Sequence, residues 1–83
     1  MSNMMPELMD YYDLEVTKLI VEKYRMSNMD ALRRFLISKT HEMLRDTEMG
    51  LFEFGPAGIF DMWESEQITH NPRNSVYIRG DAV

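Results

Sequence analysis

The feature that most constrains this chain is the absence of cysteine from a sequence of only 83 residues. A domain of this size buries only roughly 60–65% of the surface that its unfolded chain exposes, so its core is thin. Small domains compensate with disulfides, a structural metal or a partner subunit. Disulfides are excluded here, and His41 and His70 are the only histidines that could bind a structural zinc ion. We therefore expect additional burial against another protein, and no metal or other cofactor.

The charge balance bears on the class of partner. The net charge is −5 and the sequence pI is about 4.9, whereas a reader of duplex DNA normally carries a basic stripe. Nucleic acid is therefore an unfavourable partner. The first residues lack the basic and apolar regions of a signal peptide, and no apolar run approaches the ~20 residues that cross a bilayer. These observations predict a cytoplasmic protein without a membrane partner.

Helical periodicity dominates the first half of the chain. Pro6 is suited to a first helical turn, and an apolar stripe predicts a helix from there to about Met26. Ser27 resembles an N-cap for a second helix over residues 29–45, and a break into two short helices at Ser38 is an alternative. The expected buried stripe of this second segment comprises Met29, Leu32, Phe35, Leu36, Thr40, Met43 and Leu44.

The second half predicts one more helix and two extended pieces. Gly55-Pro56 opens a third helix that runs to Ile68, with Ile59, Phe60 and Trp63 on its buried face. Leu51-Phe52-Glu53-Phe54 alternates like a short strand, and residues 76–78 have strand-forming side chains. We expect a single domain over residues 1–83, with a helical core at about 6–68 and an extended tail at 69–83. Its class is mainly all-α, with three helices and a short two-stranded β element as an option.

Two groups of residues are candidates for binding a partner. The first helix carries a second apolar stripe of Tyr11, Leu14 and Val21, and two stripes predict contact on both sides of the helix. The second contact is either another molecule or the tail folded back. Trp63 is either a core anchor or an interface residue, and the tail adds Tyr77 and Ile78.

The polar residues suggest no catalytic set. Asp10 and Asp13 are explained as acidic residues near a helix N-terminus, and His41 and Glu42 as an exposed helix face. The acidic residues Asp61, Glu64 and Glu66 are most simply a solvated face of the third helix. We therefore expect no enzymatic activity.

The second helical segment carries a pattern, Ala-Leu-x-x-Phe-x-x-Ser-x-Thr-x-x-x-Leu, over residues 31–44. With the turn before it and the acidic helix end after it, the segment 21–67 resembles a group of small bacterial helical domains of unknown function. Members of that group are commonly encoded beside a toxin-like domain related to ADP-ribosyltransferases and are regarded as antitoxins. Residues 51–54 and 71–83 depart from the group's pattern. The resemblance implies a toxin as the protein partner and supplies no catalytic residues.

These observations favour a protein–protein interaction module that neutralises or regulates a neighbouring bacterial protein. Its mechanism would be occlusion of a basic groove by an acidic helical surface. The thin core and the two-sided first helix also predict a homo-oligomer. The alternative function is a small DNA-binding regulator that presents Arg33, Arg34 and Lys39 to a groove of the duplex.

Overall fold

The computed structural model describes residues 5–75, and within them the chain forms four α-helices and three 3-10 turns. The helices are α1 (Pro6–Tyr24), α2 (Asn28–Leu36), α3 (Lys39–Arg45) and α4 (Gly55–Thr69), and the 3-10 turns are Thr47–Met49, Leu51–Phe54 and Pro72–Asn74. This confirms the all-α class. The strand-forming residues 76–78, with Tyr77 and Ile78, lie outside the described residues.

Helix α1 begins and ends close to its predicted limits. Pro6 occupies the first turn, and Arg25 ends the helix in the left-handed conformation at φ 58°, with its N–H donating to the Val21 carbonyl. The predicted apolar stripe of this helix comprises Met5, Met9, Tyr12, Val16, Leu19 and Ile20. Tyr12, Val16 and Ile20 are buried, Met9 and Leu19 are half-buried, and Met5 is exposed.

The second predicted helix is divided in two, so residues 5–75 contain four α-helices rather than three. Ser38 has an extended backbone between α2 and α3, and its hydroxyl accepts the His41 N–H at 3.1 Å while donating to the Phe35 carbonyl at 2.6 Å. The side-chain hydroxyl therefore caps a new helix instead of continuing the old one. The break at Ser38, which the sequence left as an alternative, is the one that forms.

The predicted strand at residues 51–54 is wrong, since Leu51–Phe54 is a 3-10 turn and residues 5–75 contain no strand. Gly50 and Gly55 bracket the turn at φ 72° and φ 74°. The carbonyl of Phe52 accepts a hydrogen bond from the Tyr12 hydroxyl of α1, and Leu51 is buried in the core. Contacts with α1 therefore hold the segment as a turn, without any partner strand.

The acidic residues of α4 are not the solvated face that their spacing suggests. Glu64 contacts Lys23 and accepts from the Tyr24 hydroxyl, both at the end of α1. Asp61 accepts from the Ser75 hydroxyl at 2.5 Å. Each carboxylate connects α4 to another segment.

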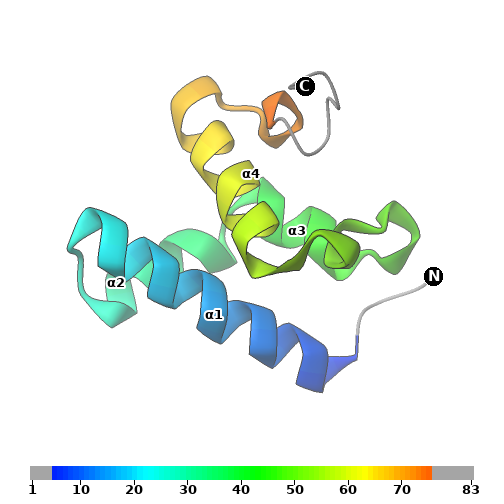
Figure 1. Ribbon diagram of the computed structural model, residues 1–83, viewed down its shortest axis with the longest axis horizontal. Helices are drawn as coiled ribbons and strands as arrows, with labels where there is room; N and C mark the ends of the chain where they lie inside the picture. The colour runs from blue at the N-terminus through cyan, green and yellow to red at the C-terminus, as the bar shows by residue number, and fades with distance from the viewer. Residues whose placement is uncertain (1–4, 76–83) are drawn as a thin grey trace.

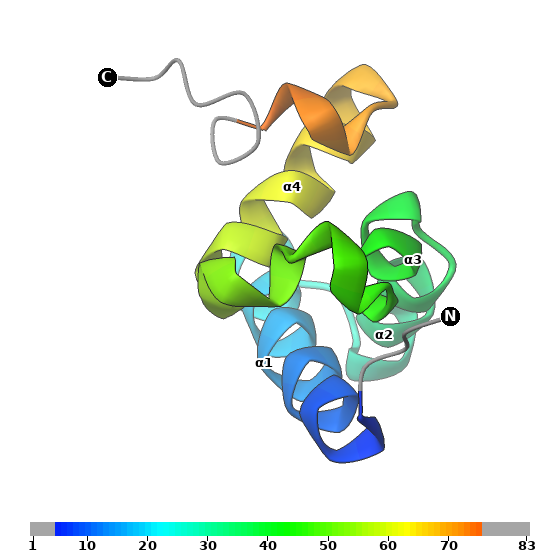
Figure 2. The same ribbon diagram turned by 90° about the vertical axis from the view of Figure 1, so that its right-hand side faces the viewer.

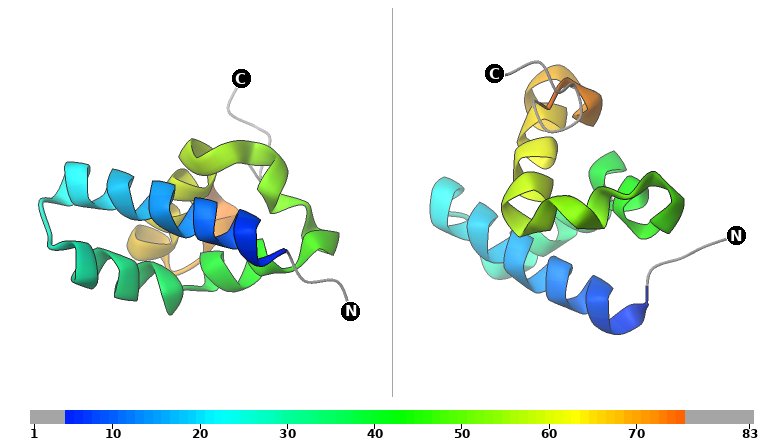
Figure 3. Two further views of the ribbon diagram at one scale, coloured as in Figure 1. Left: turned by 90° about the horizontal axis from the view of Figure 1, so that it is seen from below. Right: turned by 45° about the vertical axis from the view of Figure 1, so that its right-hand side comes forward.

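Helices α1 and α2 form one layer, and α4, which packs against α1 and α3, lies on it as the second layer (Figure 1). Helices α1 and α2 run antiparallel side by side, joined by a short turn, as the view from below shows most clearly (Figure 3). Helix α4 rises from this pair, and Pro72–Asn74 packs against its far end (Figure 2). The core where the layers meet contains Tyr12, Val16, Ile20, Ala31, Phe35, Leu44, Leu51, Ile59, Met62 and Trp63. The outer side of the α1–α2 pair is therefore left to other contacts.

Candidate functional site

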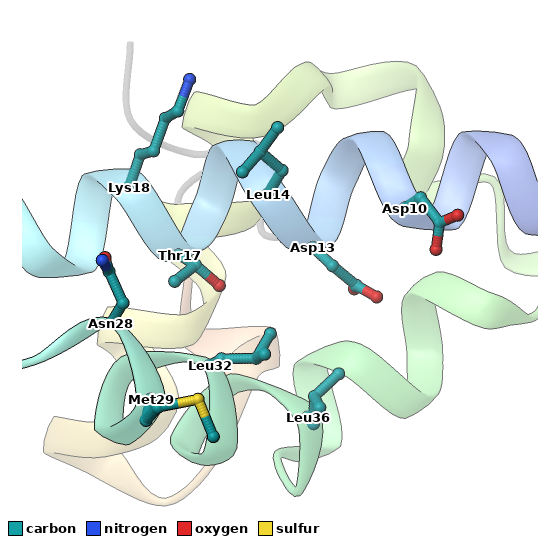
Figure 4. Close-up of a pocket in the computed structure, with 9 residues that line it drawn as sticks. All are labelled: Asp10, Asp13, Leu14, Thr17, Lys18, Asn28, Met29, Leu32 and Leu36. Carbon is teal, nitrogen blue, oxygen red and sulfur yellow. The ribbon is translucent and has the colours of Figure 1, made fainter.

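A groove of about 540 Å³ lies between α1 and α2. Its walls face each other in Figure 4, where Thr17 and Asp13 of α1 point toward α2 while Leu32 and Leu36 of α2 point toward α1. The full lining comprises Asp10, Asp13, Leu14, Thr17, Lys18, Asn28, Met29, Leu32 and Leu36. The groove therefore lies between two neighbouring helices and takes residues from both.

Large apolar side chains remain exposed along this groove. Leu14 is 56% exposed, Met29 67% and Leu36 42%. Helix α2 has only nine residues, and Ala31 and Phe35 are the ones that it buries. Its remaining apolar side chains consequently lie beside the core rather than in it, which corrects the predicted burial of Met29 and Leu36.

The apolar surface continues beyond the end of α2. Another, smaller hollow is lined by Met29, Leu32, Arg33, Leu36 and Ile37, so it shares three residues with the groove. Ile37 is 79% exposed and lies at the turn between α2 and α3. Contiguous exposed apolar surface of this kind marks interaction sites more often than scattered single residues do.

Polar side chains stand at both ends of the groove. Asp10 and Asp13 lie toward the start of α1, whereas Lys18 and Asn28 lie at the other end (Figure 4). Lys18 also forms an exposed ion pair with Glu15 at 3.5 Å. The groove thus has an acidic end and a basic end.

At the acidic end of the groove, Asp13 contacts a buried histidine, which the sequence had predicted to lie on an exposed face. His41 of α3 is 9% exposed, and its Nε2 lies 3.0 Å from Oδ1 of Asp13 on α1. The His41 ring also meets Phe35 edge-on. Burial raises the pKa of Asp13 above its ordinary value of 3.8, Asp10 adds to that rise, and the contact with His41 opposes it. The pair joins α1 to α3 and fixes one end of the groove.

Among residues 5–75, no three carboxylate or imidazole side chains gather closely enough to hold a metal ion. Within the same range, no helix is both long and apolar enough to cross a bilayer.

Comparisons of the chain with protein-family models, with curated proteins and with solved structures give no match. The resemblance of residues 21–67 to antitoxin-like domains therefore stays a prediction.

The residues predicted to bind a partner differ in how far they are exposed. Tyr11 and Leu14 are exposed on α1, while Val21 is half-buried against the core. Trp63 is 3% exposed and stacks on Phe60, so it is the core anchor of the two alternatives and presents no surface here. Tyr77 and Ile78 lie outside the described residues. Among the predicted residues that the structure describes, only Leu14 lines the groove.

Sequence reasoning missed most of the groove. Met29, Leu32 and Leu36 follow helical spacing, so they were indistinguishable from the core positions on the same helix. The exposure of Ile37 is the part that the sequence could have indicated. Ile37 follows Leu36 directly, beside the break at Ser38 that the sequence left as an alternative, and one of two adjacent apolar residues must face outward there.

Proposed function

We propose that this chain is a protein–protein interaction module that neutralises or regulates a neighbouring protein by binding it in the α1–α2 groove. The single observation that carries the proposal is the exposed apolar wall formed by Leu14, Met29 and Leu36. The resemblance to antitoxin-like domains supports a toxin as the neighbouring protein.

The groove suits an apolar helical segment of the partner. Met29, Leu32 and Leu36 follow one another at spacings of three and four residues, so they form a continuous row along about two turns of α2. Amphipathic helices bind such grooves through anchors at matching spacing. Complete burial of one such side chain contributes about 1.5–3 kcal/mol, and these half-exposed ones contribute on the order of 1 kcal/mol each.

The charge of the chain supports occlusion as the mechanism. With a net charge of −5, the domain is attracted to a basic surface, and proteins that handle nucleotides or nucleic acid have one. A bound domain of this size would cover that surface while the groove holds the apolar anchor.

The test is co-purification of this chain with the product of the adjacent reading frame. The double variant Met29→Lys/Leu36→Asp should weaken binding about a hundredfold or more, since it places two charges in the apolar contact. The matched control is Ile68→Asp on α4, which is 77% exposed and lies outside the groove. It should bind within about threefold of wild type. Equal binding by the groove variant, with unchanged circular dichroism, would refute the proposal.

A DNA-binding regulator is the second candidate, favoured by one observation. Arg33 and Arg34 are exposed next to each other on α2, and Lys39 is exposed at the start of α3. A gel shift on the DNA upstream of the gene, lost as salt is raised, would support this function. An unshifted probe at low salt would remove it.

A further inference from the structure

We infer that a second copy of this chain packs on the α1 edge of the groove as an antiparallel, two-fold symmetric homodimer centred on Leu14. The inference rests on the proposed function, because the dimer covers Leu14, one of the apolar residues that the partner would bind.

The observation behind it is the order of side chains along one face of α1. Asp10, Leu14 and Lys18 are spaced four residues apart, so they follow one another along a stripe that winds slowly around α1. Leu14 and Lys18 point to the same side of the helix in Figure 4. The order is acid, exposed leucine, base. Leu14 stands midway, and the two charges lie about 6 Å before and after it along the helix axis.

A two-fold axis at Leu14 makes this order self-complementary. In an isologous contact, residues equally far before and after the axis meet across the interface. Asp10 of each copy then faces Lys18 of the other, which forms two identical charge pairs around Leu14 against Leu14. A parallel arrangement would instead bring Asp10 against Asp10 and Lys18 against Lys18. The charge order therefore selects the antiparallel dimer.

The neighbouring side chains are compatible with this contact. Tyr11, three residues before Leu14, is half-exposed on the same side of α1 and adds aromatic surface. The exposed Lys18–Glu15 pair leaves Lys18 free to turn toward another carboxylate, since exposed pairs contribute only about 0–1 kcal/mol. The dimer would shield Leu14 until a partner with a larger apolar anchor displaces the second copy.

Charge reversal provides the decisive experiment. Asp10→Lys places lysine against lysine at both symmetric contacts, and Lys18→Asp places aspartate against aspartate. Each variant alone should dimerise at least tenfold more weakly than wild type in sedimentation at low salt. Mixed in equal amounts, the two should form a heterodimer, because the introduced lysine then meets the introduced aspartate at one contact, while the native Asp10 and Lys18 meet at the other.

The net charges of the two variants exclude a general attraction as the cause of heterodimer formation. Each reversal changes the net charge of −5 by two, to −3 or −7, so both variants stay negative and have no overall attraction for each other. Restored dimerisation also shows that both variants are folded. A mixture that stays monomeric, or an Asp10→Lys variant that dimerises like wild type, would overturn the inference.

A single introduced cysteine tests the position of the axis. The chain has no cysteine, so in Leu14→Cys only the two axial thiols of a dimer can form a disulfide. Under mild oxidation, crosslinking should be at least tenfold faster than for the control Ile68→Cys, which is exposed at the end of α4. Equal crosslinking rates would contradict an axis at Leu14.

The outcomes also separate this inference from the proposed function. The wild-type chain could be monomeric up to high micromolar concentration and still bind its partner through Met29 and Leu36. That result would refute the homodimer and support the proposed function. If the chain dimerises through Leu14 but binds no neighbouring protein, the homodimer is supported and the proposed function is refuted.

Discussion

At the scale of single residues, two buried threonines differ in the partner of their hydroxyl groups. Thr40 Oγ1 donates to Oε1 of Glu66 at 2.8 Å. Thr17 Oγ1, beneath the groove, is buried without a hydrogen-bond partner among the described residues. A buried hydroxyl without a partner loses its hydration and gains nothing in return. The two sites therefore form a natural comparison.

We expect substitution by valine to have opposite effects at these two threonines. Valine keeps the branched shape and removes the hydroxyl, so Thr17→Val should raise the free energy of unfolding by about 1 kcal/mol. Thr40→Val should lower it by about 2 kcal/mol, because a bond to a carboxylate is lost. Urea unfolding of dilute protein measures both changes. A loss at Thr17 as large as that at Thr40 would mean that its hydroxyl has a partner after all.

The burial of the Asp13 carboxyl makes stability depend on pH. Burial raises the pKa of Asp13 in the folded protein above 3.8, so the folded state binds more protons than the unfolded state at pH values just above 3.8. The free energy of unfolding therefore falls as the pH rises from 3.8 through the raised pKa. We expect this loss to be absent in Asp13→Asn, which has no carboxyl to ionise. Urea unfolding across this interval measures the difference between wild type and variant. If wild type instead gains stability relative to Asp13→Asn as the pH rises, the contact of Asp13 with His41 outweighs its burial.

At the scale of elements, α3 is a seven-residue helix that depends on another helix. Glu66 of α4 accepts hydrogen bonds from the N–H groups of Lys39 and Thr40, both at 2.9 Å, as well as from the Thr40 hydroxyl. These are amides of the first turn, which have no partner within their own helix. Isolated helices of this length are unstable in water, so this external cap stabilises α3.

Glu66→Ala tests this dependence. We expect it to lower the free energy of unfolding by about 2 kcal/mol, since it removes charged hydrogen bonds to the start of α3. Amide hydrogen exchange should accelerate in α3 more than in α1. Gln67→Ala, at the exposed neighbouring position, is the control and should change stability by less than about 0.5 kcal/mol. Equal effects of the two substitutions would show that Glu66 is not a cap.

How far the sequence predicts these elements depends on whether the cause is local. Pro6, Ser27, Ser38 and Pro56 act within a few residues, so the starts of all four helices can be read from the chain. The alternation at residues 51–54 is misleading, because the Tyr12 hydroxyl that holds Phe52 lies 40 residues away. The roles of His41 and Glu66 also depend on distant partners, and neither has a local signal.

At the scale of the whole molecule, the division of apolar residues between core and groove is a tertiary property. Leu32, Phe35 and Leu36 have similar hydrophobicity and helical spacing, yet Phe35 is buried, Leu32 half-buried and Leu36 exposed. The difference arises because the chain turns at Ser38 and α4 covers only one side of the α1–α2 pair. A sequence pattern can predict that a second apolar surface exists, as it did for Leu14, but not which side of α2 completes it.

The proposed homodimer makes the stability of the whole domain depend on concentration. A contact formed only by folded chains stabilises the folded state by mass action. Above the dimer dissociation constant, each tenfold rise in protein concentration should add about 0.7 kcal/mol per chain, half of the value for binding one ligand in excess. For a domain of this size that corresponds to a rise of about 3–5 °C in Tm. Calorimetry at rising concentrations should detect this rise in wild type, and in the mixture of Asp10→Lys with Lys18→Asp, but not in either variant alone. A wild-type Tm that is constant from micromolar to millimolar concentration would show that Leu14 meets no second copy.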